Sequence, residues 1–374
     1  MKDHITLKNK AKETKTEIYF GFDLLSDQRF LETCQKLGKR FVIVTDKKVG
    51  SLYGKSLQSL LKENDLDCLL ITFPDGEASK SRKTKEKVED EMFEAKLGRD
   101  TCLIALGGGV VTDLAGFVAA TYCRGIPYLL VPTSLLGMVD ASIGSKTGLN
   151  VKQGKNLLGS IYSPAAIFMD LSSLSTLSDR EMRNGTAEII KHGLIAEAAL
   201  YSSIVEHFEK WQQRDLALLK NLIYESSLVK KKVVEADLKE SGMRRMLNFG
   251  HTIGHAIEAI EGYGATHGEA IAIGMIVESF ISFKLGHINE TDFDDIYRLF
   301  KLMDFPLQLS SKVTIDAMIH VMGSDKKAAE TIPRFVVLNG IGKVLSFKGE
   351  YCTTIDDAML HEVLGWMVAE FFKG

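Results

Sequence analysis

The most restrictive feature of this sequence is a change in hydrophobic period near residue 165. Before that point, short apolar runs rich in β-branched residues alternate with helical patterns. The four clearest runs are RFVIVTD (40–46), DCLLITF (67–73), TCLIALGGG (101–109) and YLLVPTS (128–134). Such runs are typical of strands buried on both faces, as in parallel sheets covered by helices. The first half therefore predicts an open, mostly parallel, Rossmann-like α/β sheet.

After that point the period is helical. Residues 178–211 and 214–241 keep apolar side chains at i, i+3, i+4 and i+7, with polar faces between them. The helical pattern continues to the end except at 332–347, IPRFVVLNGIGKVLSF, where we expect a pair of short strands. A chain of 374 residues is long enough for two cores. We expect an α/β domain at 1–168, an all-α domain at 169–374, and the active site in the cleft between them.

Charge and cysteine content exclude several classes of protein. The 46 Lys and Arg residues against 49 Asp and Glu residues give a net charge of −3, so no overall positive field favours nucleic acid or a membrane surface. Any anionic ligand must be met by cations gathered locally. The five cysteines form no C-x-x-C pair and are odd in number, which argues against a disulfide framework. Without a leader-like or membrane-spanning apolar stretch, we expect a cytoplasmic protein.

Three of the nine histidines lie in the glycine-rich stretch NFGHTIGHAIEAIEGYGATHGEA (248–270). His251 and His255 are spaced i, i+4 and share a helix face, and His267 follows a turn that can return it to the same point. The stretch lacks the Glu of H-E-x-x-H, which argues against a zinc protease. Catalytic zinc usually has three protein ligands, and Glu188, an acidic residue in the otherwise apolar pattern around it, is the best carboxylate candidate. A single histidine is more often structural, but three in one hairpin favour a metal site.

Two glycine-rich segments are candidates for binding phosphate groups. In LIALGGGVVTDLAGFVAA (103–120), three glycines separate a strand from a helix, so the backbone can approach a pyrophosphate at a helix N-terminus. The pattern is not G-x-G-x-x-G, and a tight turn without a ligand is the alternative. In the segment 139–160, Lys146, Lys152, Lys155 and Asn156 occupy a glycine-rich loop where lysines can converge on a phosphate. A solvated loop explains each of these lysines equally well.

A second basic segment, LVKKKVVEADLKESGMRRMLN (228–248), stands out against the net negative charge. It contains Lys230, Lys231, Lys232, Arg244 and Arg245. We expect at least three of these five cations to lie on a solvated face.

Six blocks of the sequence together resemble the 3-dehydroquinate synthase family of the sugar-phosphate cyclases. They are GGGVVTDLAGFVAATYCRGIPYLLVPTSLL, VDASIGSKTGLN, GKNLLGSIYSP, AEIIKHG, RRMLNFGHTIGHAIEA and HGEAIAIGM. The resemblance covers roughly residues 40–345 in unbroken order. It implies conversion of 3-deoxy-D-arabino-heptulosonate 7-phosphate to 3-dehydroquinate and phosphate, a step of the shikimate pathway, with bound NAD and a divalent metal, zinc or cobalt.

The resemblance also assigns residues to the two cofactors. Glu188, His251 and His267 would hold the metal, and His255 would stand beside the substrate instead. The positions that match NAD-contacting residues of the family are Asp46, Asp75, Glu77, Lys80, Gly109, Val110, Val111, Thr112, Asp113, Thr133, Ser134, Lys146, Lys155, Ser173, Leu174, Ser175 and Thr176.

For the anionic sugar-phosphate substrate, the resemblance gives a set of polar and cationic side chains. They are Asp140, Lys146, Asn156, Lys191, Lys230, Arg244, Asn248, His255 and Lys326. Lys230 and Arg244 would bind the substrate carboxylate, and the other lysines and Asn156 would bind the phosphate. Arg124 matches an arginine that reaches the neighbouring subunit's site, which implies a homodimer.

The sequence departs from the family pattern at four positions. Thr112 and Ser145 each replace a glycine, so a side chain occupies a loop position near the cofactor or the phosphate. His192 replaces a tyrosine, and Leu238 interrupts the acidic pattern D-E-x-E. None of the four removes an implied metal ligand or substrate cation.

Three alternatives stay open at this point. Another sugar-phosphate cyclase would act on a substrate without a carboxylate, and an NAD- and metal-dependent polyol dehydrogenase would release NADH. A catalytically silent binding protein would keep the pocket without the reaction. Lys230, Arg244 and Asn248 standing together favour a substrate with a carboxylate.

Overall fold

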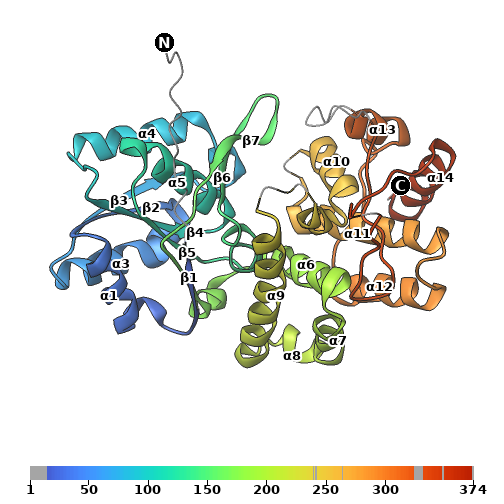
Figure 1. The fold of residues 1–374 in the computed structure, drawn as a ribbon, viewed down its shortest axis with the longest axis horizontal. Coiled ribbons are helices and arrows are strands. Elements are labelled where there is room, and N and C mark those ends of the chain that lie inside the picture. The colour runs from blue at the N-terminus through green and yellow to red at the C-terminus, as the bar shows by residue number, and fades with distance from the viewer. Residues whose placement is uncertain are drawn as a thin grey trace, which may run out of the picture.

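The computed structural model describes residues 15–372 apart from 239, 241, 263, 324–331 and 348. An α/β part and a helical part lie side by side (Figure 1). The last strand, β8 (Ala166–Asp170), precedes a run of helices that continues to the end of the described chain. Within that described chain, no helix combines the length and apolar character needed to cross a membrane.

A six-stranded sheet forms the centre of the α/β part. Its other strands are β1 (Glu17–Gly21), β2 (Arg40–Asp46), β3 (Asp67–Phe73), β4 (Thr101–Gly107) and β5 (Tyr128–Pro132). The spatial order is β1-β8-β5-β4-β2-β3, and every pairing is parallel. The predicted parallel α/β fold is therefore confirmed.

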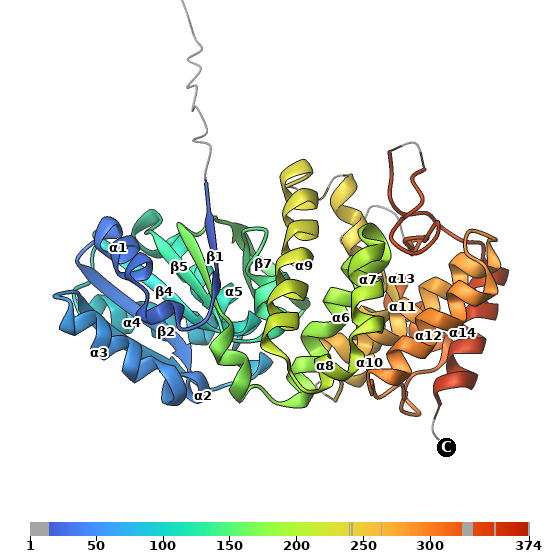
Figure 2. The same ribbon diagram turned by 90° about the horizontal axis from the view of Figure 1, so that it is seen from below.

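Helices cover both faces of this sheet (Figure 2). Phe41 and Ile43 of β2 share a hydrophobic cluster with residues of α1 (Gln28–Leu37) and α3 (Lys55–Glu63). Val42 and Val44 share another with residues of α4 (Arg82–Glu94) and α5 (Gly109–Thr121). Successive strand side chains point to opposite faces, so burial of both faces explains the continuous apolar run.

The segment expected to be a glycine-rich loop is instead a β-hairpin. β6 (Lys146–Val151) and β7 (Gly154–Ile161) pair antiparallel, and the hairpin projects from the α/β part (Figure 1). Gly148 lies opposite Gly159, and a Cβ on Gly159 would lie 1.9 Å from the carbonyl oxygen of Thr147. The glycines that indicated a loop therefore permit close contact between two strands.

The helical part is built around α11 (His267–Lys284), which is buried along most of its length. The remaining helices are α6 (Asp179–Ala196), α7 (Ala198–Glu206), α8 (Phe208–Gln212), α9 (Leu216–Ala236), α10 (His251–Glu261), α12 (Glu290–Leu302), α13 (Ile315–Gly323) and α14 (Asp357–Phe371). α11 packs against α6, α10, α12 and α14. The pair of short strands expected at 332–347 is present only as isolated bridges, such as Leu338 with Val344.

Candidate active site

The carboxyl ends of the parallel strands gather the predicted cofactor residues at one edge of the sheet. Asp46 ends β2, the stretch Asp75 to Lys80 follows β3, and Gly109 to Asp113 form the first turn of α5 after β4. Thr133 and Ser134 follow β5, and Ser173 to Thr176 follow β8. Ligands of open α/β sheets bind outside this edge where the strand order reverses, here between β2 and β4.

Among the described residues, three ion pairs join this α/β part to the helical part. Lys230 of α9 pairs with Asp140 and also donates to its backbone carbonyl at 2.7 Å. Lys146 at the start of β6 pairs with Glu240. Lys155 of β7 lies 3.0 Å from Glu258 of α10. The sheet edge and the helical part therefore face each other through charged side chains.

Glu188, His251 and His267 meet at one point. Glu188 Oε1 lies 3.3 Å from His267 Nε2 and 3.7 Å from His251 Nε2. The three ligand atoms lie within 4.8 Å of one another. Ligands bound to a tetrahedral zinc ion at about 2.0–2.1 Å lie about 3.3 Å apart, so these separations fit a metal site.

The second nitrogen of each imidazole is already engaged. His251 Nδ1 lies 3.1 Å from the carbonyl oxygen of Phe249, and His267 Nδ1 lies 3.5 Å from Glu258 Oε2. A proton on each Nδ1 leaves Nε2 free as a ligand, and both Nε2 atoms face Glu188. Metal-ligating histidines are oriented in this way by a carbonyl or a carboxylate.

The electrostatics of the triad favour a cation. Burial lowers the pKa of His267, but the hydrogen bonds that its ring donates to Glu188 and Glu258 outweigh burial and raise that pKa to about 10. Burial and the Lys191 ammonium lower the pKa of His251 well below its usual value. Burial opposes ionisation of Glu188, yet Lys191 and both imidazoles hold its pKa well below the usual range. A divalent ion on His267 Nε2 would take the place of the proton that Glu188 holds there, while Glu258 keeps the proton on Nδ1.

Local sequence signals place these ligands. Thr266 and Glu269 form a capping box that begins α11 at His267. Gly268 N donates to Asn184 Oδ1 at 2.7 Å, which brings α11 against α6, where Glu188 lies one turn further on. A Cβ on Gly268 would lie 2.4 Å from the Asn184 carbonyl oxygen, so this contact requires glycine.

Helices α10 and α11 also approach closely through glycines. A Cβ on Gly274 would lie 1.9 Å from the Gly250 carbonyl oxygen, and one on Gly254 would lie 2.5 Å from Ile271 Cδ1. This contact brings His251 and His267 together, with ring centroids 5.3 Å apart.

Three predicted substrate cations are buried. Lys191 forms an ion pair with Glu188, and Lys230 pairs with Asp140. Arg244 is 3% exposed and donates to two backbone carbonyls, those of Leu238 at 2.8 Å and Gly144 at 3.3 Å. Since neither carbonyl neutralises the guanidinium, Arg244 can pair with an anionic group of a ligand.

The first turn of α5 and the hairpin share a polar cluster. Lys80 Nζ lies 2.5 Å from Asp113 Oδ2 and contacts Asn156 Oδ1. Asn150 Nδ2 donates to Glu77 Oε1 at 2.6 Å, and Asn150 Oδ1 accepts from Asn156 N at 2.9 Å. Several predicted NAD-contacting residues are therefore connected to Asn156, a predicted phosphate ligand.

The four departures from the family pattern are accommodated in different ways. Thr112 is buried in α5 and its hydroxyl donates to the Gly109 carbonyl at 3.1 Å. Ser145 adopts a left-handed φ of 58° and its hydroxyl lies 2.9 Å from that of Ser163. His192 is fully buried with Nδ1 2.7 Å from Ser226 Oγ, and Leu238 is exposed.

Other predicted residues are exposed or lie outside the described part of the chain. Lys326 lies outside the described residues, and Arg124 is exposed. His255 lies one turn from His251 with its side chain 59% exposed, and it forms a second possible ligand group with Glu258 and His267. Lys231 and Lys232 are exposed.

Sequence reasoning missed two carboxylates of the site. Glu258 contacts both His267 and Lys155, and Glu240 contacts Lys146 and accepts from Asn248 Nδ2 at 2.9 Å. Glu258 stands seven residues after His251, a spacing that places both on one helix face. That spacing could have identified it.

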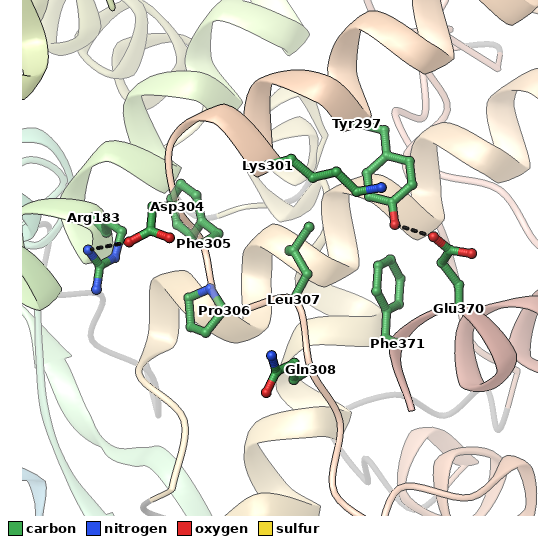
Figure 3. A pocket seen from close by; sticks show the side chains of 10 residues that line it. All are labelled: Arg183, Tyr297, Lys301, Asp304, Phe305, Pro306, Leu307, Gln308, Glu370 and Phe371. Carbon is green, nitrogen blue, oxygen red and sulfur yellow. Dashed lines mark hydrogen bonds and ion pairs between the residues drawn. The ribbon is translucent and has the colours of Figure 1, made fainter. Parts of the chain in front are cut away.

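A separate open pocket of about 520 Å³ lies elsewhere in the helical part (Figure 3). Arg183 lies 3.5 Å from Asp304, the Tyr297 hydroxyl donates to Glu370, and Lys301 Nζ lies 3.9 Å from the centre of the Tyr297 ring. None of the predicted site residues lines it.

Known proteins resemble the chain over nearly its whole length. Its residues 70–184 match the model of the 3-dehydroquinate synthase N-terminal domain, and residues 185–328 match that of the C-terminal domain. A 3-dehydroquinate synthase of Nitrosospira multiformis is 44% identical over 306 residues, which cover 82% of this chain and 83% of that protein.

Two solved structures are similar in fold at lower identity. A 2-epi-5-epi-valiolone synthase from Streptomyces hygroscopicus with NAD+ and Zn2+ bound has a TM-score of 0.88 at 28% identity, covering 98% of this chain and 100% of that one. A 2-deoxy-scyllo-inosose synthase complexed with carbaglucose-6-phosphate, NAD+ and Co2+ has a TM-score of 0.81 at 26% identity, covering 93% and 95%.

Proposed function

The chain belongs to the 3-dehydroquinate synthase family, and we propose that its cleft catalyses the reaction of that family. The reaction converts 3-deoxy-D-arabino-heptulosonate 7-phosphate to 3-dehydroquinate and phosphate, so the chain is a lyase of the shikimate pathway. The convergence of Glu188, His251 and His267 among buried cations is the observation that most supports this site.

We propose that NAD and a divalent metal, zinc or cobalt, serve as cofactors. Glu188, His251 and His267 would hold the metal, and the residues at the carboxyl edge of the sheet, with Lys146 and Lys155, would contact NAD. When bound, NAD takes up a hydride from the substrate and returns it, and the metal polarises the substrate oxygen at the reacting carbon as a Lewis acid. Hydride return leaves no net oxidation.

Arg244 and Lys230 are proposed to bind the substrate carboxylate. Both are buried, and a buried anion needs paired cations to offset its desolvation. A guanidinium held by two carbonyls presents its remaining N–H groups in a fixed direction. Asn248 and Lys146 both contact the Glu240 carboxylate. Asn248 would orient the hydroxyl groups of the substrate next to its carboxylate.

The phosphate is proposed to bind where Lys146, Asn156 and Lys191 approach the cleft, with Lys326 from the segment outside the description. Lys146 pairs with Glu240, and Asn156 contacts Lys80. Both side chains would exchange these contacts for contacts with the incoming phosphate. His255, exposed beside the triad, would contact the substrate, and Asp140 would keep Lys230 in place.

The proposal also covers the domain bounds, the cellular location and the oligomeric state. Residues 1–168 would be the NAD-binding domain, and residues 169–374 the metal- and substrate-binding domain. The protein would act in the cytoplasm as a homodimer in which Arg124 reaches the site of the other subunit. If so, mixing Arg124→Ala protein with His251→Ala protein should restore part of the activity that each homodimer lacks.

One assay tests the proposed reaction. Protein, NAD, metal and the heptulosonate phosphate are mixed, and phosphate release is followed together with the absorbance of reduced nicotinamide. The proposal expects stoichiometric phosphate release without accumulation of NADH. Accumulating NADH would instead indicate a polyol dehydrogenase, and release of no phosphate would refute the proposal.

A further inference from the structure

Glu278 of α11 is a buried carboxyl that the proposed reaction does not use. Its side chain is fully buried. Burial raises its pKa to about 8, and the groups that oppose this rise are backbone N–H groups, not cations. A buried carboxyl without a cationic partner lowers the stability of the fold, so its presence indicates a specific role.

The carboxyl of Glu278 faces the start of α10. Oε2 accepts a hydrogen bond from Val336 N at 3.3 Å. The backbone N–H groups of Gly250 and Thr252 are near enough to oppose the rise of the Glu278 pKa. Oε1 has no partner of full hydrogen-bond geometry among the described residues. Gly250 and Thr252 are the two neighbours of His251, so the carboxyl lies near the backbone on both sides of a proposed metal ligand.

The direction of the His251 ring depends on this short stretch of backbone. The first N–H groups of α10 lack acceptors within the helix, and His251 is its first residue. The ring is oriented by the contact of Nδ1 with the carbonyl oxygen of Phe249, two residues earlier. Any shift of residues 249–252 would therefore move Nε2 away from Glu188.

Other contacts hold the same stretch from the same side. Gly250 has a left-handed φ of 79°, and a Cβ on it would lie 2.5 Å from Met275 Cγ, one turn before Glu278. Thr252 Oγ1 donates to the Arg334 carbonyl at 2.6 Å, two residues from Val336. Glu278 thus lies where α10, α11 and the chain at 334–336 meet.

We infer that Glu278 is a positioning residue for the metal site, since its carboxyl fixes the backbone around His251 and so directs Nε2 toward Glu188 and His267. The inference rests on the proposed metal site and adds to it a residue outside the ligand set. A neutral glutamine has the same length and keeps a carbonyl acceptor, whereas methionine has similar volume and no acceptor.

The test measures metal affinity and not activity. Metal-free full-length protein is titrated with Co2+ against a chelator, and the absorption band of the bound ion is recorded. Glu278→Met should weaken Co2+ binding about 10- to 100-fold, as removal of outer partners of metal ligands does, and alter the band. Glu278→Gln should stay close to the unsubstituted protein.

Ser282→Ala is the matched control. Ser282 lies one turn further along α11 and is equally buried. Its hydroxyl accepts from Leu338 N at 2.9 Å and donates to the Glu278 backbone carbonyl at 2.8 Å, so its substitution leaves the Glu278 carboxyl in place. Its Co2+ affinity and absorption band should be unchanged. If Glu278→Met does not fold, Glu278→Asp, which withdraws the carboxyl by one methylene, should show the same loss.

The outcomes separate this inference from the metal site itself. Wild-type affinity in Glu278→Met, or an equal loss in Ser282→Ala, would overturn the positioning role while leaving the metal site intact. Failure of the unsubstituted protein to bind Co2+ would instead refute the metal site on which the inference rests.

Discussion

Lys155 and Glu258 form an ion pair of 3.0 Å that joins the β6–β7 hairpin to α10. The other oxygen of Glu258 lies 3.5 Å from His267 Nδ1, so this carboxyl contacts both a proposed NAD-contacting lysine and a proposed metal ligand. Burial opposes ionisation of Glu258, yet His267 and Lys155 hold its pKa well below the usual range. The cofactor side and the metal side of the site are connected through one anionic side chain.

Glu258→Gln should weaken metal binding about 10- to 100-fold, because the neutral amide no longer stabilises the Nδ1–H of His267 as a carboxylate does. Chelator competition measures the change. Glu261→Gln is the control, since Glu261 lies on the same helix but accepts from Ser310 N at 2.9 Å. Equal affinity in the two variants would contradict the role of Glu258.

Arg244→Ala should lower kcat/KM at least about 100-fold while metal content stays normal, because a buried substrate carboxylate would lose its charged partner. Steady-state kinetics and metal analysis provide the measurement. Arg245→Ala is the adjacent control, since Arg245 pairs with Glu350 at 2.5 Å and is only partly buried. Normal kcat/KM in Arg244→Ala would remove Arg244 from the substrate site.

Glu278 should make the protein less stable as pH rises. Its pKa is about 8 in the fold against 4.5 for the ordinary carboxyl. Below pH 4.5 both states are protonated, and between these values only the unfolded state loses the proton. The free energy of unfolding therefore falls by up to about 1.4 kcal/mol per pH unit over that window, and the loss is complete above pH 8.

Glu278→Gln removes this contribution. Denaturant unfolding at several pH values between 5 and 8 should show a stability difference between the variant and the parent that grows with pH in favour of the variant. A difference that does not change with pH would show that Glu278 does not titrate in this window.

Metal binding should release a proton near neutral pH. The pKa of His267, raised to about 10, means that its ring is protonated before the ion binds, and Nε2 must lose that proton to become a ligand. Calorimetric titration with Co2+ in buffers of different ionisation enthalpy measures the number of protons. In His267→Gln the released proton should be absent; an unchanged proton count there would contradict the assignment.

The fold was predictable where the apolar runs were long. The runs at 40–46 and 67–73 coincide with β2 and β3. Residues 41–45 of β2 are buried on both faces, which explains the continuous apolar run, whereas β3 at the edge of the sheet is partly exposed. β1 and β8 were missed because EIYFG and AIFMD are five-residue segments with few β-branched residues. Asp215 caps α9, and its carboxylate accepts from Leu218 N at 2.8 Å.

The site was predictable in part. The i, i+4 spacing placed His251 and His255 on one helix, and the isolated acid Glu188 was found by its apolar surroundings. The spacing did not reveal that His255 is exposed while His251 faces Glu188, since that difference depends on how α10 packs against α11. The partners Glu240 and Glu258 were missed for the same reason: their contacts cross between segments far apart in the sequence.

The assignment of His251, and not His255, to the metal is the claim on which the site depends, and one comparison tests it. The pKa of His251 is low enough for the ring to be neutral, so His251→Ala removes a ligand without leaving a new buried charge unpaired. Co2+ titration of metal-free protein should show affinity at least about 100-fold weaker in His251→Ala and unchanged in His255→Ala. Unchanged affinity in His251→Ala, with loss in His255→Ala, would contradict the account and place the ion among His255, Glu258 and His267.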